Sequence, residues 1–272
     1  MIEIIKTYQS LLDNECLPIQ QQELDRMDNI LRETGFCIIA GYHGSGKSSL
    51  ARRYSHYKHD LRRVYCKGID SQNILYELEK DSQPVFLDSV TPLLYDNKFF
   101  QRVKNRAEQS LVVLGVHIEP ENISLLFSDH SENLITVGSL CYEDARLIAN
   151  YPFNNERLNL DKLLDYSGMR RRDLINLCME AYLIGGNFSP ESIEQGTKNL
   201  ADKSQRVYKH IFEEHFTEQQ REVIKRIITD KMIPSNNIDA NILVRTGILK
   251  KNEAELVLNG RLLELIFKKF LN

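Results

Sequence analysis

The stretch Gly41-Tyr42-His43-Gly44-Ser45-Gly46-Lys47-Ser48 decides the fold, because it is a complete Gly-x-x-x-x-Gly-Lys-Ser phosphate-binding loop. Glycines in such a loop let the backbone turn tightly and bring its N–H groups close to phosphate oxygens. Lys47 is predicted to reach the β- and γ-phosphates of a nucleotide, and the Ser48 hydroxyl is predicted to bind Mg²⁺. The predicted nucleotide contacts in this stretch are Gly41, His43, Gly44, Ser45, Gly46, Lys47, Ser48 and the following Ser49.

The residues on either side of the loop support this interpretation. Residues 36–40 (Phe-Cys-Ile-Ile-Ala) form a short apolar run, which is typical of a buried parallel strand. Residues 49–54 can begin a helix, whose N-terminus attracts anions. A chance match in a surface loop would lack both neighbours, so we predict a strand, a phosphate-binding loop and a helix in that order.

Composition and charge indicate an ordinary globular protein. The 272 residues are 42% hydrophobic and 27% charged, and the net charge of −3 gives no overall attraction to nucleic acid or anionic lipid. No apolar run is long enough to span a bilayer, and residues 1–6 lack a signal-peptide pattern. The five cysteines are widely spaced without a Cys-x-x-Cys pair, which favours buried thiols over zinc or disulfides. We therefore expect a cytoplasmic protein without membrane contact.

Apolar runs alternate with helical patterns up to about residue 138. The predicted strands are residues 36–40, 64–66, 84–88, 111–116 and 134–137, and helical patterns include residues 4–12, 23–31, 74–78 and 99–109. This alternation predicts an α/β fold with a parallel sheet that carries helices on both faces. We assign residues 1–138 to a P-loop core that includes the N-terminal helices.

The pattern changes to helices alone after residue 138. Helices are predicted at residues 143–151, 160–166 and 171–184, and residues 139–204 are assigned to an all-helical lid. From about residue 205 the order is a helix capped by Thr217 and Gln220, a short helix at 239–246, a hairpin at 248–258 and a helix at 262–271. This order is typical of a winged helix-turn-helix, so residues 205–272 are assigned to a winged-helix domain.

Asp88 is the predicted second element of the nucleotide site. It ends the apolar run 84–88, and an acid at the carboxyl end of a strand beside a phosphate-binding loop can hold Mg²⁺. The alternative is an ordinary acidic residue at a strand end. Ser89 follows where many ATPases of this architecture have a Glu that polarises the attacking water, and a hydroxyl cannot accept that proton effectively. The sequence therefore supports nucleotide binding more strongly than hydrolysis, with Glu119 or Glu121 as candidate substitutes.

Two further positions carry groups suited to binding phosphate. His117 follows the strand 111–116, where it either contacts the γ-phosphate or simply caps the strand end. Arg170, Arg171 and Arg172 begin a predicted helix, where the helix dipole disfavours cations. These arginines either bind a phosphate across a domain junction or form a solvated or ion-paired face.

Two segments of the chain are locally basic. Residues 52–63 combine Arg, Lys and His with Tyr54 and Tyr57, a mixture that can contact nucleic acid but more often forms an exposed helix face. Residues 206–272 carry 12 Lys or Arg and 9 Asp or Glu, a net of +3, whereas the remaining residues have 23 against 29 and a net of −6. This asymmetry mildly favours double-stranded DNA as a partner, with Asn241 and Arg245 as candidate base contacts.

Taken together, these motifs resemble the AAA+ class of P-loop ATPases, and within it the STAND or archaeal-type ATPases and the origin-initiator branch. The resemblance treats residues 85–88 as the Walker B strand, the strand ending near His117 as sensor 1, and residues 167–171 as sensor 2. It implies that Arg171 contacts the γ-phosphate from the helical lid, and that the helix around residues 18–31 covers the adenine. The catalytic residues would be Lys47, Asp88 and Arg171, with Ser48 and Asp88 holding the metal and His117 and Arg171 among the nucleotide contacts.

The chain departs from the AAA+ pattern in two places. Ser89 replaces the usual acid, and no arginine lies between Ile118 and Cys141, where many AAA+ rings carry the finger that enters a neighbouring subunit. Arg102 or Arg106 are the candidate replacements. Cooperative hydrolysis around a ring is therefore disfavoured, and a nucleotide-controlled switch in which the lid closes on the core fits better.

We predict an ATP- and Mg²⁺-dependent switch that engages DNA or a protein partner through its C-terminal domain, as a monomer or homo-oligomer. A role in transposition, replication or mobile-element defence rests on analogy with the fold. ATP is preferred to GTP because the chain lacks an Asn-Lys-x-Asp motif. The alternatives are a hydrolysis-poor signalling or scaffold protein without DNA binding, and a small-molecule kinase, which would need an acceptor-binding acid next to Asp88.

Overall fold

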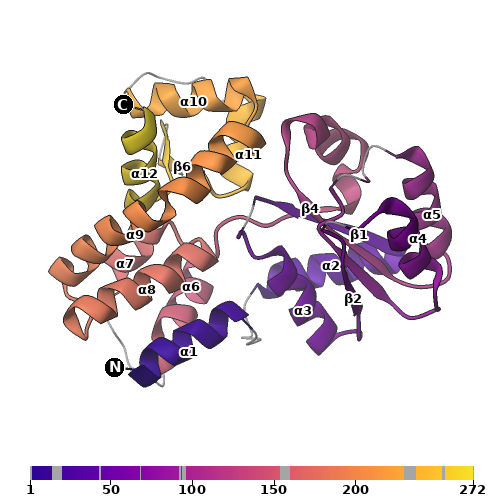
Figure 1. Cartoon of the computed structure of the whole chain (residues 1–272), viewed down its shortest axis with the longest axis horizontal. Coiled ribbons are helices and arrows are strands. Elements are labelled where there is room, and N and C mark those ends of the chain that lie inside the picture. Colours follow the sequence, from indigo (N-terminus) through magenta and orange to yellow (C-terminus); the bar gives the residue numbers. More distant parts are fainter. Residues whose placement is uncertain are drawn as a thin grey trace. The chain divides into compact units, whose positions relative to one another are not determined.

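The computed structural model describes residues 2–13, 20–42, 44–67, 69–91, 93, 96–153, 160–229, 237–252 and 255–271. These residues form two compact units (Figure 1). Residues 20–137 form the sheet unit, and residues 1–19 together with residues 138–272 form the helical unit. The first helix, α1 (Ile2–Asp13), therefore packs with the C-terminal residues, whereas the sequence pattern predicts that it joins the P-loop core.

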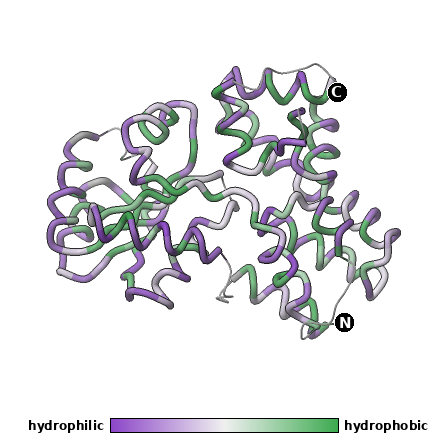
Figure 2. The backbone as a smooth tube through the Cα atoms, turned by 180° about the vertical axis from the view of Figure 1, so that it is seen from behind, coloured by the Kyte–Doolittle hydropathy of each residue, from purple (hydrophilic) through white to green (hydrophobic). Residues whose placement is uncertain are grey.

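The sheet unit is built on five parallel strands in the order β2-β3-β4-β1-β5. The strands are β1 (Phe36–Gly41), β2 (Arg62–Tyr65), β3 (Val85–Asp88), β4 (Val112–His117) and β5 (Leu134–Thr136). Each of them lies within or beside one of the predicted apolar runs, so the predicted parallel sheet is confirmed. The central strands β1 and β4 are almost continuously hydrophobic (Figure 2), as expected for strands covered on both faces.

Helices cover both faces of this sheet, with α2 and α3 on one side and α4 and α5 on the other (Figure 1). Their bounds are α2 (Gln21–Thr34), α3 (Lys47–Tyr57), α4 (Ser71–Glu79) and α5 (Asn97–Ala107). Leu24, Met27 and Leu31 of α2 recur at helical spacing and pack with Leu50 and Tyr54 of α3 in one buried cluster. Three short helical turns, η2 (Pro120–Asn122), η3 (Leu125–Asp129) and η4 (Ser131–Asn133), connect β4 to β5.

The strand order determines which side chains meet at the functional edge. Parallel strands end at the same edge of a sheet, and ligands of such sheets bind outside the carboxyl ends where the strand order reverses. Here β4 lies between β1 and β3, with Gly41 aligned to His117 and Asp88 aligned to Gly115. The phosphate-binding loop, Asp88 and His117 are therefore brought to one edge by the topology.

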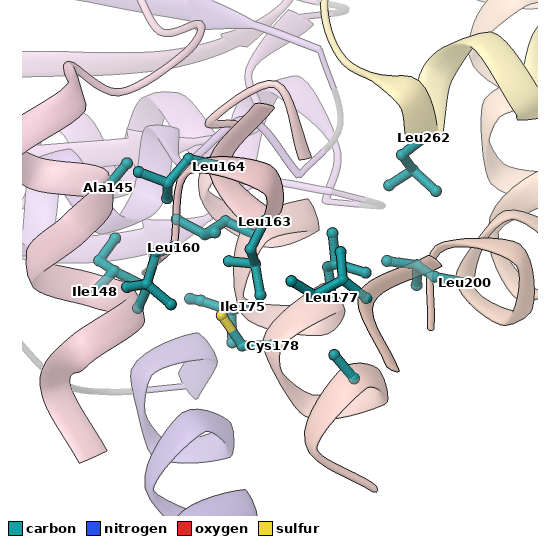
Figure 3. Close-up of a cluster of buried hydrophobic side chains, with 14 of the residues drawn as sticks. Ala145, Ile148, Leu160, Leu163, Leu164, Ile175, Leu177, Cys178, Leu200 and Leu262 are labelled. Carbon is teal, nitrogen blue, oxygen red and sulfur yellow. The ribbon is translucent and has the colours of Figure 1, made fainter. Parts of the chain in front are cut away.

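The helical unit has its own hydrophobic core (Figure 3). Its helices are α6 (Tyr142–Asn150), α7 (Asp161–Ser167), α8 (Arg171–Gly185) and α9 (Pro190–His210), with the short turns η5 (Tyr151–Phe153) and η6 (Ile211–His215). Leu163, Leu177 and Cys178 are fully buried at its centre. Helix α1 joins this core through Tyr8, whose hydroxyl donates a hydrogen bond of 2.5 Å to the Ala149 carbonyl.

Helix α9 is the largest element that the sequence pattern does not predict. It runs for 21 residues, with Ser189 as its N-cap and Pro190 in its first turn. The predicted boundary between residues 204 and 205 lies inside this helix.

The last elements are α10 (Glu218–Ile228), α11 (Ile238–Arg245), β6 (Leu249–Asn252), β7 (Glu255–Leu258) and α12 (Arg261–Leu271). Thr217 and Gln220 form the predicted capping box at the start of α10. Strands β6 and β7 pair antiparallel, with Leu249 opposite Leu258. The helix, helix, hairpin, helix order predicted for this region is thus observed among the described residues.

The cysteines differ in one respect from the expectation of buried thiols. Cys37, Cys66 and Cys178 are buried, but Cys141 is exposed. Its sulfur accepts a hydrogen bond from the Asp144 amide and so caps the start of α6. Cys16 lies outside the described residues.

Candidate nucleotide-binding site

The loop between β1 and α3 has the backbone of a phosphate cradle. Gly44 (φ +78°) and Gly46 (φ +109°) adopt conformations that side-chain-bearing residues rarely take. A Cβ on Gly41 would lie 2.4 Å from Ser45 Oγ and 2.8 Å from the Val137 carbonyl oxygen, so only glycine fits there. Helix α3 begins at Lys47, which leaves its first N–H groups directed at the loop. His43, a predicted contact, lies outside the described residues.

Lys47 is folded back onto its own loop. Its ammonium group donates to the carbonyl oxygens of Gly41 (2.9 Å) and Tyr42 (3.1 Å), and it lies 3.3 Å from Nδ1 of His117. The side chain is 5% exposed. Burial lowers the pKa of Lys47 to about 7, although the nearby Asp88 carboxylate opposes this shift. Lys47 and His117, each predicted to contact the nucleotide, therefore lie in contact with each other.

Ser48 and Asp88 form the candidate metal site. The Ser48 hydroxyl donates to Oδ2 of Asp88 at 2.8 Å, and Asp88 is 2% exposed. Gly115, the aligned residue on β4, makes room for this carboxylate, because a Cβ there would lie 3.1 Å from its Oδ1. A hydroxyl and a carboxylate oxygen are donors that Mg²⁺ prefers, so the residues fit this metal.

Arg63 is a member of the site that the sequence motifs do not reveal. One of its guanidinium nitrogens lies 2.6 Å from Oδ2 of Asp88, the oxygen that also accepts from Ser48. The pair forms because Tyr65 of β2 aligns with Asp88 of β3, which places Arg63 on the same face two residues away. Only this strand register would have identified it, since in sequence Arg63 belongs to the basic run 52–63.

That basic run is not a single exposed face. Arg53 is 1% exposed, Tyr54 is buried, and Arg62 pairs with Glu77 and Asp81. The interpretation of the run as one solvated helix face is therefore wrong.

Position 89, next to the metal site, carries no acid. Ser89 has a positive φ of 68°, and its amide donates to the Gly115 carbonyl. Of the candidate substitutes, Glu119 accepts from the Asn122 amide in a capping box, and Glu121 is exposed. Burial, with a smaller contribution from Glu121, raises the pKa of Glu119. A raised pKa makes a carboxylate a better base, but the Glu119 side chain already accepts a hydrogen bond that caps η2.

The loop after β4 holds His117 in place. The Thr91 hydroxyl accepts from the His117 amide at 2.9 Å, and the Asn122 side chain donates to the His117 carbonyl at 2.8 Å. His117 is half-buried beside Lys47. Thr91 and Asn122 are positioning residues that the sequence reasoning missed, because their contacts follow from the turn geometry and from no motif.

The predicted arginines have different environments. Arg171, in the helical unit, is 6% exposed and donates to the Leu11 carbonyl of α1. Arg170 is also buried and pairs with Asp173 at 2.5 Å, whereas Arg172 is exposed. The three arginines therefore do not form one solvated face.

The two candidate finger residues also differ. Arg102 is exposed and pairs with Glu79, so it remains a candidate for the arginine finger that enters a neighbouring subunit. Arg106 is 5% exposed and donates to the carbonyls of Leu78, Asp81 and Gln83. Arg106 therefore holds the sheet unit together and is not a finger.

Comparison with solved structures identifies the class of fold. A Walker-type ATPase of Pyrococcus abyssi superposes with a TM-score of 0.57 and 9% sequence identity over 95% of this chain and 99% of that one. A proline-to-glycine mutant of Thermotoga maritima RuvB superposes with a TM-score of 0.51 and 14% identity, over 96% of this chain and 97% of that one. At this identity the likeness concerns the fold alone, which this chain shares with a Walker-type ATPase and with RuvB.

No family model matches the sequence, and no curated protein matches it either. None of the described helices is long and apolar enough to cross a membrane.

Proposed function

We propose that this chain binds ATP and Mg²⁺ at the carboxyl edge of its sheet and uses the nucleotide as a switch. The observation that carries the proposal is the 2.8 Å hydrogen bond between Ser48 and Asp88, beside a lysine already seated in the loop. Loop amides, Lys47, Ser45 and Ser49 would hold the phosphates, and Ser48 and Asp88 would hold the metal. When bound, Mg²⁺ would supply positive charge that neutralises the phosphates.

Slow hydrolysis is part of this proposal. Ser89 cannot act as a base, and Glu119 is engaged in a turn. His117 would report the γ-phosphate through its contact with Lys47. Arg171 would act as a second sensor, and release of its bond to the Leu11 carbonyl would then accompany nucleotide binding. Contacts made only with ATP would favour one state of the switch.

The test is nucleotide binding and turnover by the purified chain. We expect saturable binding of a fluorescent ATP analogue in Mg²⁺, lost in Lys47→Ala and kept in Lys198→Ala, which removes an exposed lysine of α9. Turnover should be slow and should also disappear in Lys47→Ala. Equal binding by the unmodified chain and Lys47→Ala would refute the proposal.

We further propose that residues 217–271 form a winged helix that engages double-stranded DNA in the cytoplasm. The order of α10, α11, hairpin and α12 supports a winged helix. Asn241 and Arg245 are both exposed and lie one turn apart on α11, as expected for base contacts, and Lys251 is exposed on the hairpin.

Fluorescence anisotropy with a duplex, over a range of salt concentrations, tests DNA binding. Arg245→Ala should weaken binding more than Arg226→Ala, which removes an exposed arginine of α10 that pairs with Glu222. An absence of salt-dependent binding would favour the alternative, a hydrolysis-poor switch whose C-terminal region contacts a protein. Dependence of duplex binding on ATP would link the two units.

A further inference from the structure

Asp88 already has a cation when no metal is bound. The Arg63 guanidinium and the Ser48 hydroxyl both contact the same oxygen, Oδ2, at 2.6 Å and 2.8 Å. The carboxylate side chain is only 3% exposed, and a buried carboxylate without a counter-charge is strongly destabilising. Arg63 therefore stabilises the metal-free site.

The arginine is held loosely compared with its neighbours. Its side chain is 42% exposed, and Asp88 is the only hydrogen-bond or ion-pair partner that it has among the described residues. Arg62, one residue earlier, contacts both Glu77 and Asp81. Arg63 can thus leave Asp88 by losing one contact and moving into solvent.

Mg²⁺ and this guanidinium compete for the same oxygen. Ser48 and Asp88 would hold Mg²⁺ when it is bound, and the metal would then share the oxygen that Arg63 contacts. The two cations would also repel each other across a single buried carboxylate. We therefore expect metal loading to weaken the contact between Arg63 and Asp88.

We propose that Arg63 is a built-in counter-ion of Asp88 that Mg²⁺ displaces, so that the metal enters the site only together with the negative charge of a nucleotide. This inference rests on the proposed function. In the nucleotide-free state Arg63 would hold the Asp88 carboxylate in position and balance its charge. Mg²⁺ alone must displace a like charge from Asp88, whereas Mg²⁺ bound to ATP phosphates carries its own compensation.

The first test measures how much Mg²⁺ the chain needs to bind nucleotide. A fluorescent ATP analogue is held at fixed concentration while Mg²⁺ is titrated. Arg63→Gln should lower the half-saturating Mg²⁺ concentration about tenfold, the effect of removing one partly exposed charged hydrogen bond. The matched control is Arg62→Gln, which removes a neighbouring ion-paired arginine of the same strand and should leave the Mg²⁺ requirement unchanged.

The second test uses thermal unfolding and does not depend on activity. Arg63→Gln should unfold at a lower temperature than the unmodified chain in EDTA, and this difference should vanish in saturating Mg²⁺ and ATP. Arg63→Lys keeps the positive charge but loses the planar guanidinium. Its Mg²⁺ requirement and its unfolding temperature in EDTA should therefore lie between those of the unmodified chain and Arg63→Gln. If Arg63→Gln does not fold, Arg63→Lys replaces it in both tests.

Two results would overturn the inference. One is an unchanged Mg²⁺ requirement in both Arg63 variants. The other is weaker nucleotide binding by Arg63→Gln at saturating Mg²⁺, because Arg63 would then be a phosphate ligand. Failure of the proposed function has a different signature, since the unmodified chain would then bind the analogue no better than Lys47→Ala.

Discussion

The Lys47 ammonium group should make nucleotide affinity depend on pH above neutrality. Burial lowers the pKa of Lys47 to about 7 in the nucleotide-free site, although Asp88 raises it in part. Bound phosphates would raise this pKa again, because they add negative charge beside the ammonium group. Binding is then strongest below pH 7, where Lys47 is already protonated, and weakens as pH rises and the free site loses its proton.

The size of the effect follows from that pKa. With a pKa of about 7 in the free site, about one site in eleven is protonated at pH 8, so affinity should fall roughly tenfold between pH 6 and pH 8. This factor corresponds to about 1.4 kcal/mol. At pH 8 each binding event should take up close to one proton.

Isothermal titration calorimetry at pH 8, in two buffers of different ionisation enthalpy, counts that proton directly. His117 also carries an ionisable ring and lies 3.3 Å from Lys47, so His117→Asn is the control, and it should retain the uptake at pH 8. Affinity that stays flat from pH 6 to pH 8, with no proton uptake, would show that Lys47 is fully charged in the free site and would refute the reasoning.

Three further predictions concern the phosphate-binding loop, the core of the helical unit and the cap of α10. Gly41→Ala should abolish nucleotide binding while circular dichroism shows a folded chain, because its Cβ would lie 2.8 Å from the Val137 carbonyl; normal binding would show that the loop can shift. Leu177→Ala, at a fully buried position of α8, should lower the free energy of unfolding by about 2–5 kcal/mol in urea denaturation. Thr217→Ala should cost about 1 kcal/mol by removing the cap of α10, whereas Thr217→Ser should cost little, and equal losses would exclude the cap as the cause.

The sheet and the phosphate-binding loop could be predicted because their signals are local. Short apolar runs identify β1, β3, β4 and β5, and β2 only in part because it begins with two arginines. The glycines of residues 41–48 occur where positive φ or close packing requires them. Asp88 and His117 could be placed at the site because each ends a strand. The pairing of Ser48 with Asp88 then follows from parallel topology.

Helix α9 is not predicted because small and polar residues interrupt the apolar positions of its buried face, which has only Ile193 and Leu200 as large buried apolar side chains. Gly196, Thr197 and Ala201 are buried on it, and a Cβ at Gly196 would lie 2.9 Å from the Ala181 amide nitrogen of α8. Two large apolar residues seven positions apart are too sparse a signal to predict a helix of 21 residues. Arg63 was missed for a different reason, since its contact depends on the register of β2 against β3, which no local pattern encodes.

The placement of α1 has a consequence for synthesis of the chain. The partners that hold this helix are distant in sequence, because Tyr8 bonds to Ala149 across 141 residues and Leu11 to Arg171 across 160. At about 5–20 residues per second, a ribosome needs on the order of 10 to 30 s to supply them. The whole sheet unit is completed in that interval. The first helix to be made is thus among the last to find its core, and until then its apolar face is available to chaperones.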